Sequence, residues 1–260
     1  MVAAATTATH PLYLPASDFR RLLEQQGPSL ALWRAAEIAA LREQCYERPL
    51  LDLGCGDGLV TSLVLPRVDI GVDPDSRALE RAARHGIYAQ LGAVPVEEIE
   101  LPPCSVNTVV SNSVLEHLPQ IDTVLKTVAR LLRPGGQLIF TAPTAAFSTW
   151  LFLPAARYAA WRNRVLDHHN LWSPACWAEH LAHAGLKVEL VRPYLRRPLV
   201  WLWDALELLQ QVWIARRRLV SLVWRRIPPA LMQRLAHRAA RCDLAAPAPG
   251  GGQLIVARKK

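Results

Sequence analysis

The sequence has few cysteines, and they follow no metal or disulfide pattern. Five cysteines are spread widely along the 260 residues, and no two of them form a CxxC pair. Disulfide frameworks use an even set of closely placed cysteines, and structural zinc sites usually use short CxxC spacings. We therefore expect neither a disulfide framework nor a metal site, and a reducing, cytoplasmic location.

The chain also lacks segments typical of secretion or membrane insertion. Residues 1–10 contain no lysine, no arginine and no long apolar run, so we expect no secretory signal there. The longest uncharged stretch, residues 134–156, contains a Gly-Gly pair, Pro143 and Pro154. Its first half has the pattern of a strand in a soluble protein, so we predict no membrane span.

Net positive charge is lacking outside one segment. The net charge is +8, but residues 192–242 contain eleven arginines, no lysine and only two acids, which leaves the rest of the chain near neutral. A basic balance confined to one segment indicates a local interface. With 51% hydrophobic residues, the chain can bury the core of one elaborated domain.

Short apolar runs alternate with helical patterns along the chain. This alternation predicts parallel strand pairing and a doubly wound α/β sheet. Strands are expected at residues 49–53, 68–72, 87–91, 107–111, 137–142, 186–191 and 253–257. Helices are expected at residues 17–46 with a break at Gly27-Pro28, and at 59–65, 76–85, 121–132 and 173–184.

A glycine-rich turn follows the first of these strands. The chain reads LLDLGCGDG over residues 50–58, and Asp73 ends the next strand. Glycines let a ligand approach the backbone closely, and an acid at that strand end can accept hydrogen bonds from both ribose hydroxyls. The alternative is a tight turn that binds no ligand. The spacing is GxGxG, and Asp57 would repel a phosphate, so a nucleoside without phosphates, such as S-adenosylmethionine, fits better than a dinucleotide.

Four motifs in order carry a family resemblance. LLDLGCGDG and IGVDPD are followed by VNTVVSNSVLEHL and LLRPGGQLIFTAP, which together span about residues 50–143. This series resembles the class I S-adenosylmethionine-dependent methyltransferases. The resemblance implies a Rossmann-like α/β fold: a seven-stranded, mostly parallel sheet with helices on both faces, and one antiparallel strand near the C-terminal end.

The resemblance also implies a cofactor site for S-adenosylmethionine. Asp52 and the backbone of Gly54, Cys55 and Gly56 would face the methionine end, and Gly58 would allow close packing at the helix start. Many relatives carry an acid near the adenine where this chain has Gly92 and Ala93. The expected cofactor-binding residues are Asp52, Gly54, Cys55, Gly56, Gly58, Asp73, Pro74, Gly92, Ala93, Asn112, Ser113 and His117.

Histidines in two segments are candidates for the chemistry. Glu116 and His117 at the mouth of the pocket form either an acid–base pair or a brace for the loop before Pro119. His168, in the stretch Asp167-His168-His169-Asn170, matches a histidine that often faces the substrate in similar methyltransferases. We predict that His168 is catalytic and takes a proton from an attacking hydroxyl. The alternative is a loop histidine bonded to the backbone.

The sequence predicts a chain of four parts. Residues 1–48 form an N-terminal helical cap, 49–198 the methyltransferase core, 199–245 an Arg- and Trp-rich helical insertion, and 246–260 the final strand. Residues 199–226 have an amphipathic pattern, with polar residues such as Asp204 recurring at a step of seven opposite a face that includes Leu202 and Leu209. This segment is either a lid or homodimer surface, or it docks on an anionic membrane, on the inner face of the membrane. Binding to nucleic acid is not expected.

The predicted function is methyl transfer from S-adenosylmethionine to a small-molecule or lipid-linked acceptor, at oxygen. Methyl transfer is an in-line displacement on an activated cofactor, so positioning supplies much of the rate. Two alternatives remain: an NAD(P)-binding oxidoreductase, and a non-catalytic adenosyl-binding scaffold protein. The acceptor itself is not encoded in any motif of the sequence.

Overall fold

An eight-stranded sheet forms the centre of the molecule. The computed structural model describes residues 5–210, 213–214, 217–218, 224 and 226–260. The strand order is β1-β7-β10-β6-β5-β2-β3-β4, and only β10 runs antiparallel to its neighbours, β6 and β7. The strands are β1 (Thr6–Thr7), β2 (Leu50–Leu53), β3 (Val68–Val72), β4 (Tyr88–Gly92), β5 (Val106–Asn112), β6 (Leu132–Pro143), β7 (Leu186–Tyr194) and β10 (Gly252–Lys259).

The predicted α/β fold with a mostly parallel sheet is confirmed, and the strand count differs by one. The additional strand, β1, pairs Thr6 with Leu190 and Thr7 with Val191 along β7. Two residues are too few to carry a period-2 pattern, so the sequence contains no signal for this strand. The seven predicted strands all occur, and β6 begins five residues earlier than expected, at Leu132.

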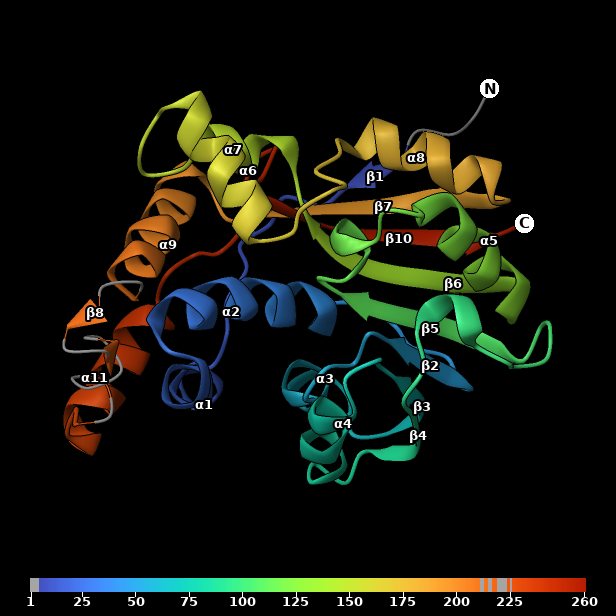
Figure 1. The fold of residues 1–260 in the computed structure, drawn as a ribbon, viewed down its shortest axis with the longest axis horizontal. Coiled ribbons are helices and arrows are strands. Elements are labelled where there is room, and N and C mark those ends of the chain that lie inside the picture. Colours follow the sequence, from blue (N-terminus) through green and yellow to red (C-terminus); the bar gives the residue numbers. More distant parts are fainter. Residues whose placement is uncertain (1–4, 211–212, 215–216, 219–223, 225) are drawn as a thin grey trace.

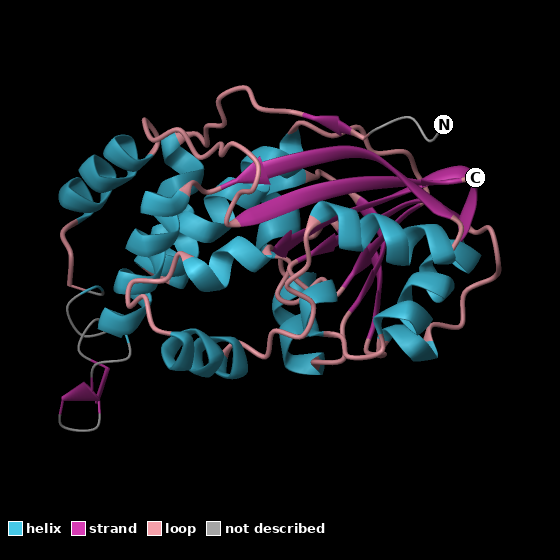
Figure 2. Ribbon diagram, turned by 90° about the horizontal axis from the view of Figure 1, so that it is seen from above, coloured by secondary structure: helices cyan, strands magenta, loops and turns pink. Residues whose placement is uncertain are grey.

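Helices cover both faces of the sheet (Figure 1). The expected break falls at Gly27, whose φ of +80° separates α1 from α2. Figure 2 shows a block of helices beside one end of the sheet. The helices are α1 (Ala16–Gln26), α2 (Pro28–Arg42), α3 (Leu59–Val64), α4 (Ser76–Ala83), α5 (Ile121–Leu131), α6 (Ala145–Thr149), α7 (Ala156–Val165), α8 (Pro174–His183), α9 (Arg197–Gln210) and α11 (Pro229–Ala239), with 3-10 turns at Val96–Glu98 and Leu115–His117.

The central strands are buried on both faces, so their side chains alternate between two apolar cores. On β6, Leu138 and Phe140 belong to the core beneath α5 and α8, whereas Ile139 belongs to the core beneath α1, α2 and α3. The antiparallel β10 alternates in the same way, with Leu254 on the α2 side and Ile255 on the α5 side. Continuous apolar runs are typical of strands covered on both faces. The N-terminal helices therefore form one layer of the core.

The predicted orientation of α9 is wrong. Asp204 was expected on a solvated face, but it is fully buried and forms an ion pair with Arg162 of α7. Its Oδ2 atom also accepts hydrogen bonds from the Tyr158 hydroxyl at 2.7 Å and from the Phe152 amide at 2.9 Å. A buried carboxylate is tolerated when it is paired and hydrogen-bonded. The apolar side chains Trp201, Leu202 and Leu209 lie on the exposed side, at 46%, 41% and 56% exposure.

The prediction of a helical stretch over residues 199–226 is also wrong at the described residues 213–214 and 217–218. Helix α9 ends at Gln210, and the described residues beyond it include an antiparallel pair of two-residue strands, β8 (Trp213–Ile214) and β9 (Arg217–Arg218). Aromatic and β-branched residues such as Trp213 and Ile214 favour strands over helices. Much of the predicted apolar face lies outside the described residues. The domain boundaries at residues 48, 198 and 245 stay predictions.

The expectation about membrane spans concerned residues 134–156. Most of their first half lies in β6, at the centre of the sheet. Among the described residues, no helix combines the length and the apolar character needed to cross a membrane.

Candidate active site

The glycine-rich turn lies at the point where the strand order reverses. Strand β2 has β3 on one side and β5 on the other, and such switch points are where open α/β sheets bind ligands. Gly54 has φ +70° and a Cβ atom there would collide with the side chain of Val114. The Gly56 amide donates to Oδ2 of Asp73 at 2.9 Å. The turn and the acid are thus held together by the chain itself.

A cavity of about 380 Å³ opens above this turn. It collects backbone and side-chain groups from the ends of β2, β3 and β5 and from α2, which is the placement expected for a nucleoside cofactor. Seven of the predicted cofactor-binding residues line it: Asp52, Gly54, Cys55, Gly56, Asp73, Asn112 and Ser113. The lining that the sequence did not indicate includes Gln26, Arg34, Thr61, Asp75 and Val114.

Asp52 is the most buried acid of this cavity. Its side chain is 1% exposed and accepts a 2.7 Å hydrogen bond from the Tyr88 hydroxyl. Burial disfavours the charged carboxylate and raises the pKa of Asp52 to about 6. The group therefore changes charge within a pH range that is accessible to experiment.

The remaining predicted cofactor residues lie outside this lining. Gly58 has φ +73°, and a Cβ atom there would come within 3.1 Å of Ala82 and 3.0 Å of Tyr88. Gly92 lines a different cavity, along β3 and β4. Pro74 and Ala93 line neither of these two cavities, and His117 faces a third.

This third cavity, of about 110 Å³, adjoins the cofactor cavity. The two share Arg34 and Ser113 among their lining residues. Three aromatic rings form one wall: Trp33 of α2 contacts Phe147 of α6 and Trp203 of α9, with ring centroids 5.5 and 5.4 Å apart. Such a wall suits a flat, apolar molecule. We call this space the acceptor cavity; it is lined by Leu30, Trp33, Arg34, Ser113, Glu116, His117, Pro143, Phe147, Leu166, His168 and Trp203.

The buried carboxylate of Glu37 fixes helix α2 against the end of β5. It accepts hydrogen bonds from the Trp33 indole at 2.9 Å and from Arg34 Nη1 at 2.7 Å. It also accepts from Asn112 Nδ2 at 3.1 Å and from the Ser113 hydroxyl. Glu37 thereby positions residues of both cavities. The sequence offered one signal for it, the spacing of three between Arg34 and Glu37 on a helix, which allows a side-chain pair.

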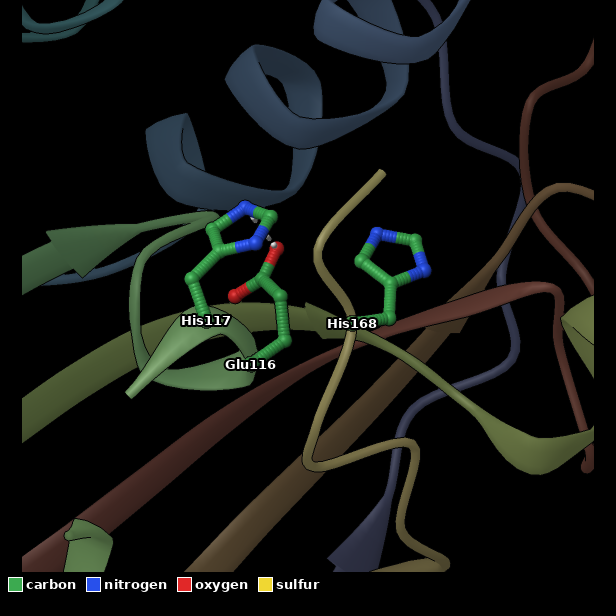
Figure 3. Close-up of side chains that lie close together, drawn as sticks. All are labelled: Glu116, His117 and His168. Carbon is green, nitrogen blue, oxygen red and sulfur yellow. Dashed lines mark ion pairs between the residues drawn. The ribbon is translucent and has the colours of Figure 1, made fainter. Parts of the chain in front are cut away.

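Glu116, His117 and His168 form the polar end of the acceptor cavity (Figure 3). Glu116 is 1% exposed, and burial raises its pKa to about 8. Burial also lowers the pKa of His168 to about 4, with the charges of His117 and Arg162 acting in the same direction. Near neutral pH, Glu116 is therefore an uncharged acid and His168 an uncharged imidazole.

The loop carrying His168 is tied to the turn after β5 by other residues. The backbone carbonyl of Glu116 accepts from the amides of His169 and Asn170 at 2.8 and 3.1 Å. The side chain of Asn170 donates to the carbonyls of Leu115 and Leu118. Asn170 thus braces this turn, while the side chains of Glu116 and His168 face the cavity. His169 points elsewhere and contacts Asp167 at 3.1 Å.

Several of these residues were missed from the sequence. Trp33, Phe147 and Trp203 come from three separate helices, and Arg34 and Glu37 lie in the segment assigned to a helical cap. Aromatic residues in helices are usually explained by core packing, so no local signal marked them as walls of a cavity. Their juxtaposition depends on how α2, α6 and α9 meet.

Comparison with known proteins gives consistent results. A family model described as "Methyltransferase domain" matches residues 30–191. A ubiquinone biosynthesis O-methyltransferase of Rhizobium etli is 29% identical over 190 residues, which cover 67% of this chain and 76% of that protein.

Solved structures share the fold. An S-adenosylmethionine-dependent methyltransferase of Thermotoga maritima superposes with a TM-score of 0.60 at 16% identity, covering 94% of this chain and 99% of the other. The phosphoethanolamine N-methyltransferase 2 of Haemonchus contortus, solved with S-adenosylmethionine, gives a TM-score of 0.56 at 18% identity, covering 93% of this chain and 60% of the other.

Proposed function

The chain belongs to the methyltransferase domain family and is an S-adenosylmethionine-dependent enzyme, and on this premise we propose that it methylates an oxygen atom of a small acceptor. The alternative of an NAD(P)-binding oxidoreductase is thereby discarded. The observation that carries the proposal is the pair of adjoining cavities that share Arg34 and Ser113. One can hold the cofactor and the other, with its aromatic wall, the acceptor. The O-methyltransferase named among the curated relatives supports oxygen as the target atom.

We assign the ribose of the cofactor to Asp73 and its methionine end to Asp52 and the turn of Gly54, Cys55 and Gly56. Asp73 already accepts from the amides of Gly56 and Asp75, and a carboxylate has lone pairs left for two ribose hydroxyls. Asn112 and Ser113 then lie beside the transferred methyl group. We place the adenine beside Pro74, Gly92 and Ala93, which lie outside the lining of the cofactor cavity. Its planar ring would bind there through contacts with the backbone.

In the acceptor cavity, a planar ring packed beside Trp33, Phe147 and Trp203 would turn a hydroxyl toward His168. The oxygen attacks the methyl carbon in line with the departing sulfur, and the products are the methyl ether, S-adenosylhomocysteine and one proton. Fixing the two reactants in adjoining cavities supplies much of the acceleration. His168 is the side chain that we expect to contact the reacting hydroxyl.

A lipid-linked acceptor is the second candidate class. The outward face of α9 exposes Trp201, Leu202 and Leu209, while Trp203 of the same helix lines the acceptor cavity. A lipid-linked acceptor with its ring in the cavity and its apolar tail along α9 would contact both faces of this helix. The same face could instead bind a second copy of the chain, and vesicle sedimentation separates these outcomes.

The test of the proposed function is turnover of S-adenosylmethionine labelled in its methyl group. Purified protein is incubated with matched panels of phenols, catechols and amines, and with extracted lipids, and the products are identified by mass spectrometry. We expect the label in the methyl ether of a hydroxylated aromatic compound. Transfer only to nitrogen would contradict the oxygen assignment. Cofactor binding without turnover on any fraction would contradict both the hydroxylated aromatic compounds and the extracted lipids as acceptors.

A further inference from the structure

Three side chains able to bind a metal meet at the polar end of the acceptor cavity. Glu116 and His117 come from the turn after β5, and His168 comes from the loop after α7, about fifty residues later in the chain. One ligand atom from each lies within 4.8 Å of the other two. Figure 3 shows the three side chains together. The sequence contains no metal-ligand spacing because the three groups are brought together only by the fold.

Two of the three groups are buried with unused hydrogen-bonding capacity. Within the described part of the chain, Oε2 of Glu116 and Nδ1 of His168 are buried and have no hydrogen-bond partner. Glu116 is 1% exposed. A buried polar atom without a partner carries an energetic cost and calls for an explanation. A bound cation would supply a partner to each of them.

The third group is already oriented as a metal ligand. Nδ1 of His117 lies 2.9 Å from the carbonyl oxygen of Asp167. Because a carbonyl only accepts, the imidazole carries its proton on Nδ1 and leaves the lone pair on Nε2. That Nε2 atom lies 3.8 Å from Oε1 of Glu116. Metal-binding histidines commonly donate their other ring N–H to a backbone carbonyl in this way.

Each nearby arginine contacts a carboxylate, which offsets part of its repulsion of a cation at this cluster. Arg34 lies 2.7 Å from Glu37, and Arg162 lies 2.8 Å from Asp204. When Glu116 releases its proton to water on metal binding, the cluster contributes one carboxylate and two imidazoles, a ligand set typical of zinc and related ions in catalytic sites that keep an open position. Metal-to-ligand bonds of about 2.1 Å place ligands about 3.4 Å apart in a tetrahedral site. The ligand atoms now lie within 4.8 Å of one another, so they need to approach by at most about 1.4 Å.

We propose that Glu116, His117 and His168 bind one divalent transition-metal ion, with Zn²⁺ as the best match, and that the ion's open position takes the hydroxyl oxygen of the acceptor. The binding of the ion stands on these side chains alone, whereas its role rests on the proposed function. In this arrangement His168 would act as a ligand in place of the base predicted from the sequence, and the hydroxyl bound to the ion would lose its proton to water. The oxygen–methyl bond forms as the carbon–sulfur bond breaks, and the metal keeps its oxidation state.

Direct binding of Co²⁺ tests the site without any acceptor. Untagged protein is stripped with a chelator and titrated with Co²⁺, whose visible ligand-field bands report coordination by nitrogen and oxygen. We expect saturation at one Co²⁺ per chain and displacement by Zn²⁺. Glu116→Gln and His168→Ala should each weaken Co²⁺ binding by about 100-fold or more.

The matched control is His169→Ala, which removes the neighbouring histidine of the same loop, and it should bind Co²⁺ as the wild type does. S-adenosylmethionine binding, measured on every variant, shows that the fold is intact. Equal Co²⁺ affinity in Glu116→Gln, His168→Ala and the wild type would overturn the metal site, even if the enzyme methylates an oxygen. Co²⁺ binding that is weakened in Glu116→Gln and His168→Ala would support the metal site, even if the methylated atom proves to be nitrogen.

Discussion

The guanidinium of Arg162 and the carboxylate of Asp204 form a fully buried ion pair, with 2.8 Å between Nε and Oδ1. The pair joins α7 to α9 and lies beside Trp203, whose ring is 5.3 Å from the guanidinium carbon. Because Trp203 lines the acceptor cavity, this ion pair holds the helices that close one side of the site. A buried pair adds little net stability over apolar residues, but losing one partner leaves a buried charge uncompensated.

Asp204→Ala should therefore destabilise the protein by about 3–5 kcal/mol, measured as the free energy of unfolding in urea. The control is Glu189→Ala, which removes one partner of the exposed pair with Arg258. Exposed pairs contribute only about 0–1 kcal/mol. Equal effects of the two substitutions would contradict the burial of the Arg162–Asp204 pair.

Asp73→Ala should weaken the binding of S-adenosylmethionine by about 2–3 kcal/mol, because one or two charge-assisted hydrogen bonds to the ribose are lost. Calorimetric titration of the folded variant measures this change. Asp69→Ala, near the start of the strand that Asp73 follows and outside the cavity lining, is the control and should keep the wild-type affinity. Unchanged binding in Asp73→Ala would remove Asp73 from the cofactor site.

Cofactor affinity should fall as the pH is lowered from 7.5 toward 5, values chosen to bracket the pKa of Asp52, which burial raises to about 6. Protonated Asp52 no longer attracts the ammonium group of the cofactor. Titrations across this range, compared with Asp52→Asn, measure the effect, and the pH dependence should be much weaker in the variant. If cofactor affinity declined as steeply with pH in Asp52→Asn, the pH dependence would belong to another group.

The free energy of unfolding should change with pH in the sense opposite to that of cofactor affinity. The folded-state pKa of Asp52 lies above its ordinary value of 3.8, so the folded protein binds more protons than the unfolded chain between these two values. The buried carboxylate costs stability above pH about 6, and that cost is relieved as the pH falls. Asp52→Asn should thus exceed the wild type in unfolding free energy at pH 8, by an amount that shrinks toward pH 5.

His168→Ala should lower the rate of methyl transfer by about 100-fold or more, with little change in cofactor affinity. The prediction follows from the position of His168 in the acceptor cavity and not in the cofactor cavity. His169→Ala, in the same loop, should keep wild-type turnover. A rate for His168→Ala equal to that of His169→Ala would leave His168 without a part in the reaction.

The parts of the fold that could be predicted are those with local signals. The glycine turn and Asp73 are each marked by residue type at a strand end, and their 2.9 Å hydrogen bond follows from the parallel pairing of β2 and β3. The orientation of α9 could not be predicted, because a polar residue at a helical position normally faces solvent. Asp204 is buried only because Arg162, some forty residues earlier, supplies its counter-charge.

The acceptor cavity shows the same limit. Glu116 and His117 were noticed as a pair and His168 as a single residue, and no pattern in the sequence placed them within 4.8 Å of one another. Glu37 was missed altogether, because the bonds that define its role come from Asn112 and Ser113, more than seventy residues away. Contacts of this kind depend on tertiary packing and leave no periodic trace in the chain.

The exposed face of α9 decides between a lipid-linked and a freely soluble acceptor. Trp201, Leu202 and Leu209 are each more than 40% exposed, and Trp with Leu beside arginines suits the interface of an anionic bilayer. We expect the protein to sediment with vesicles of phosphatidylcholine and phosphatidylglycerol, less so at high salt, because arginine contacts are screened within about 10 Å at 0.1 M. The double variant Trp201→Glu with Leu209→Glu should stay in the supernatant. The control is Tyr13→Glu, which changes an exposed aromatic residue outside α7 and α9 and should sediment like the wild type.

If the wild-type protein instead forms a dimer that the double variant disrupts, and stays in solution with every vesicle, the face binds a second chain. The acceptor must then reach the cavity from water, and a small hydroxylated ring without an apolar tail becomes the substrate class to test.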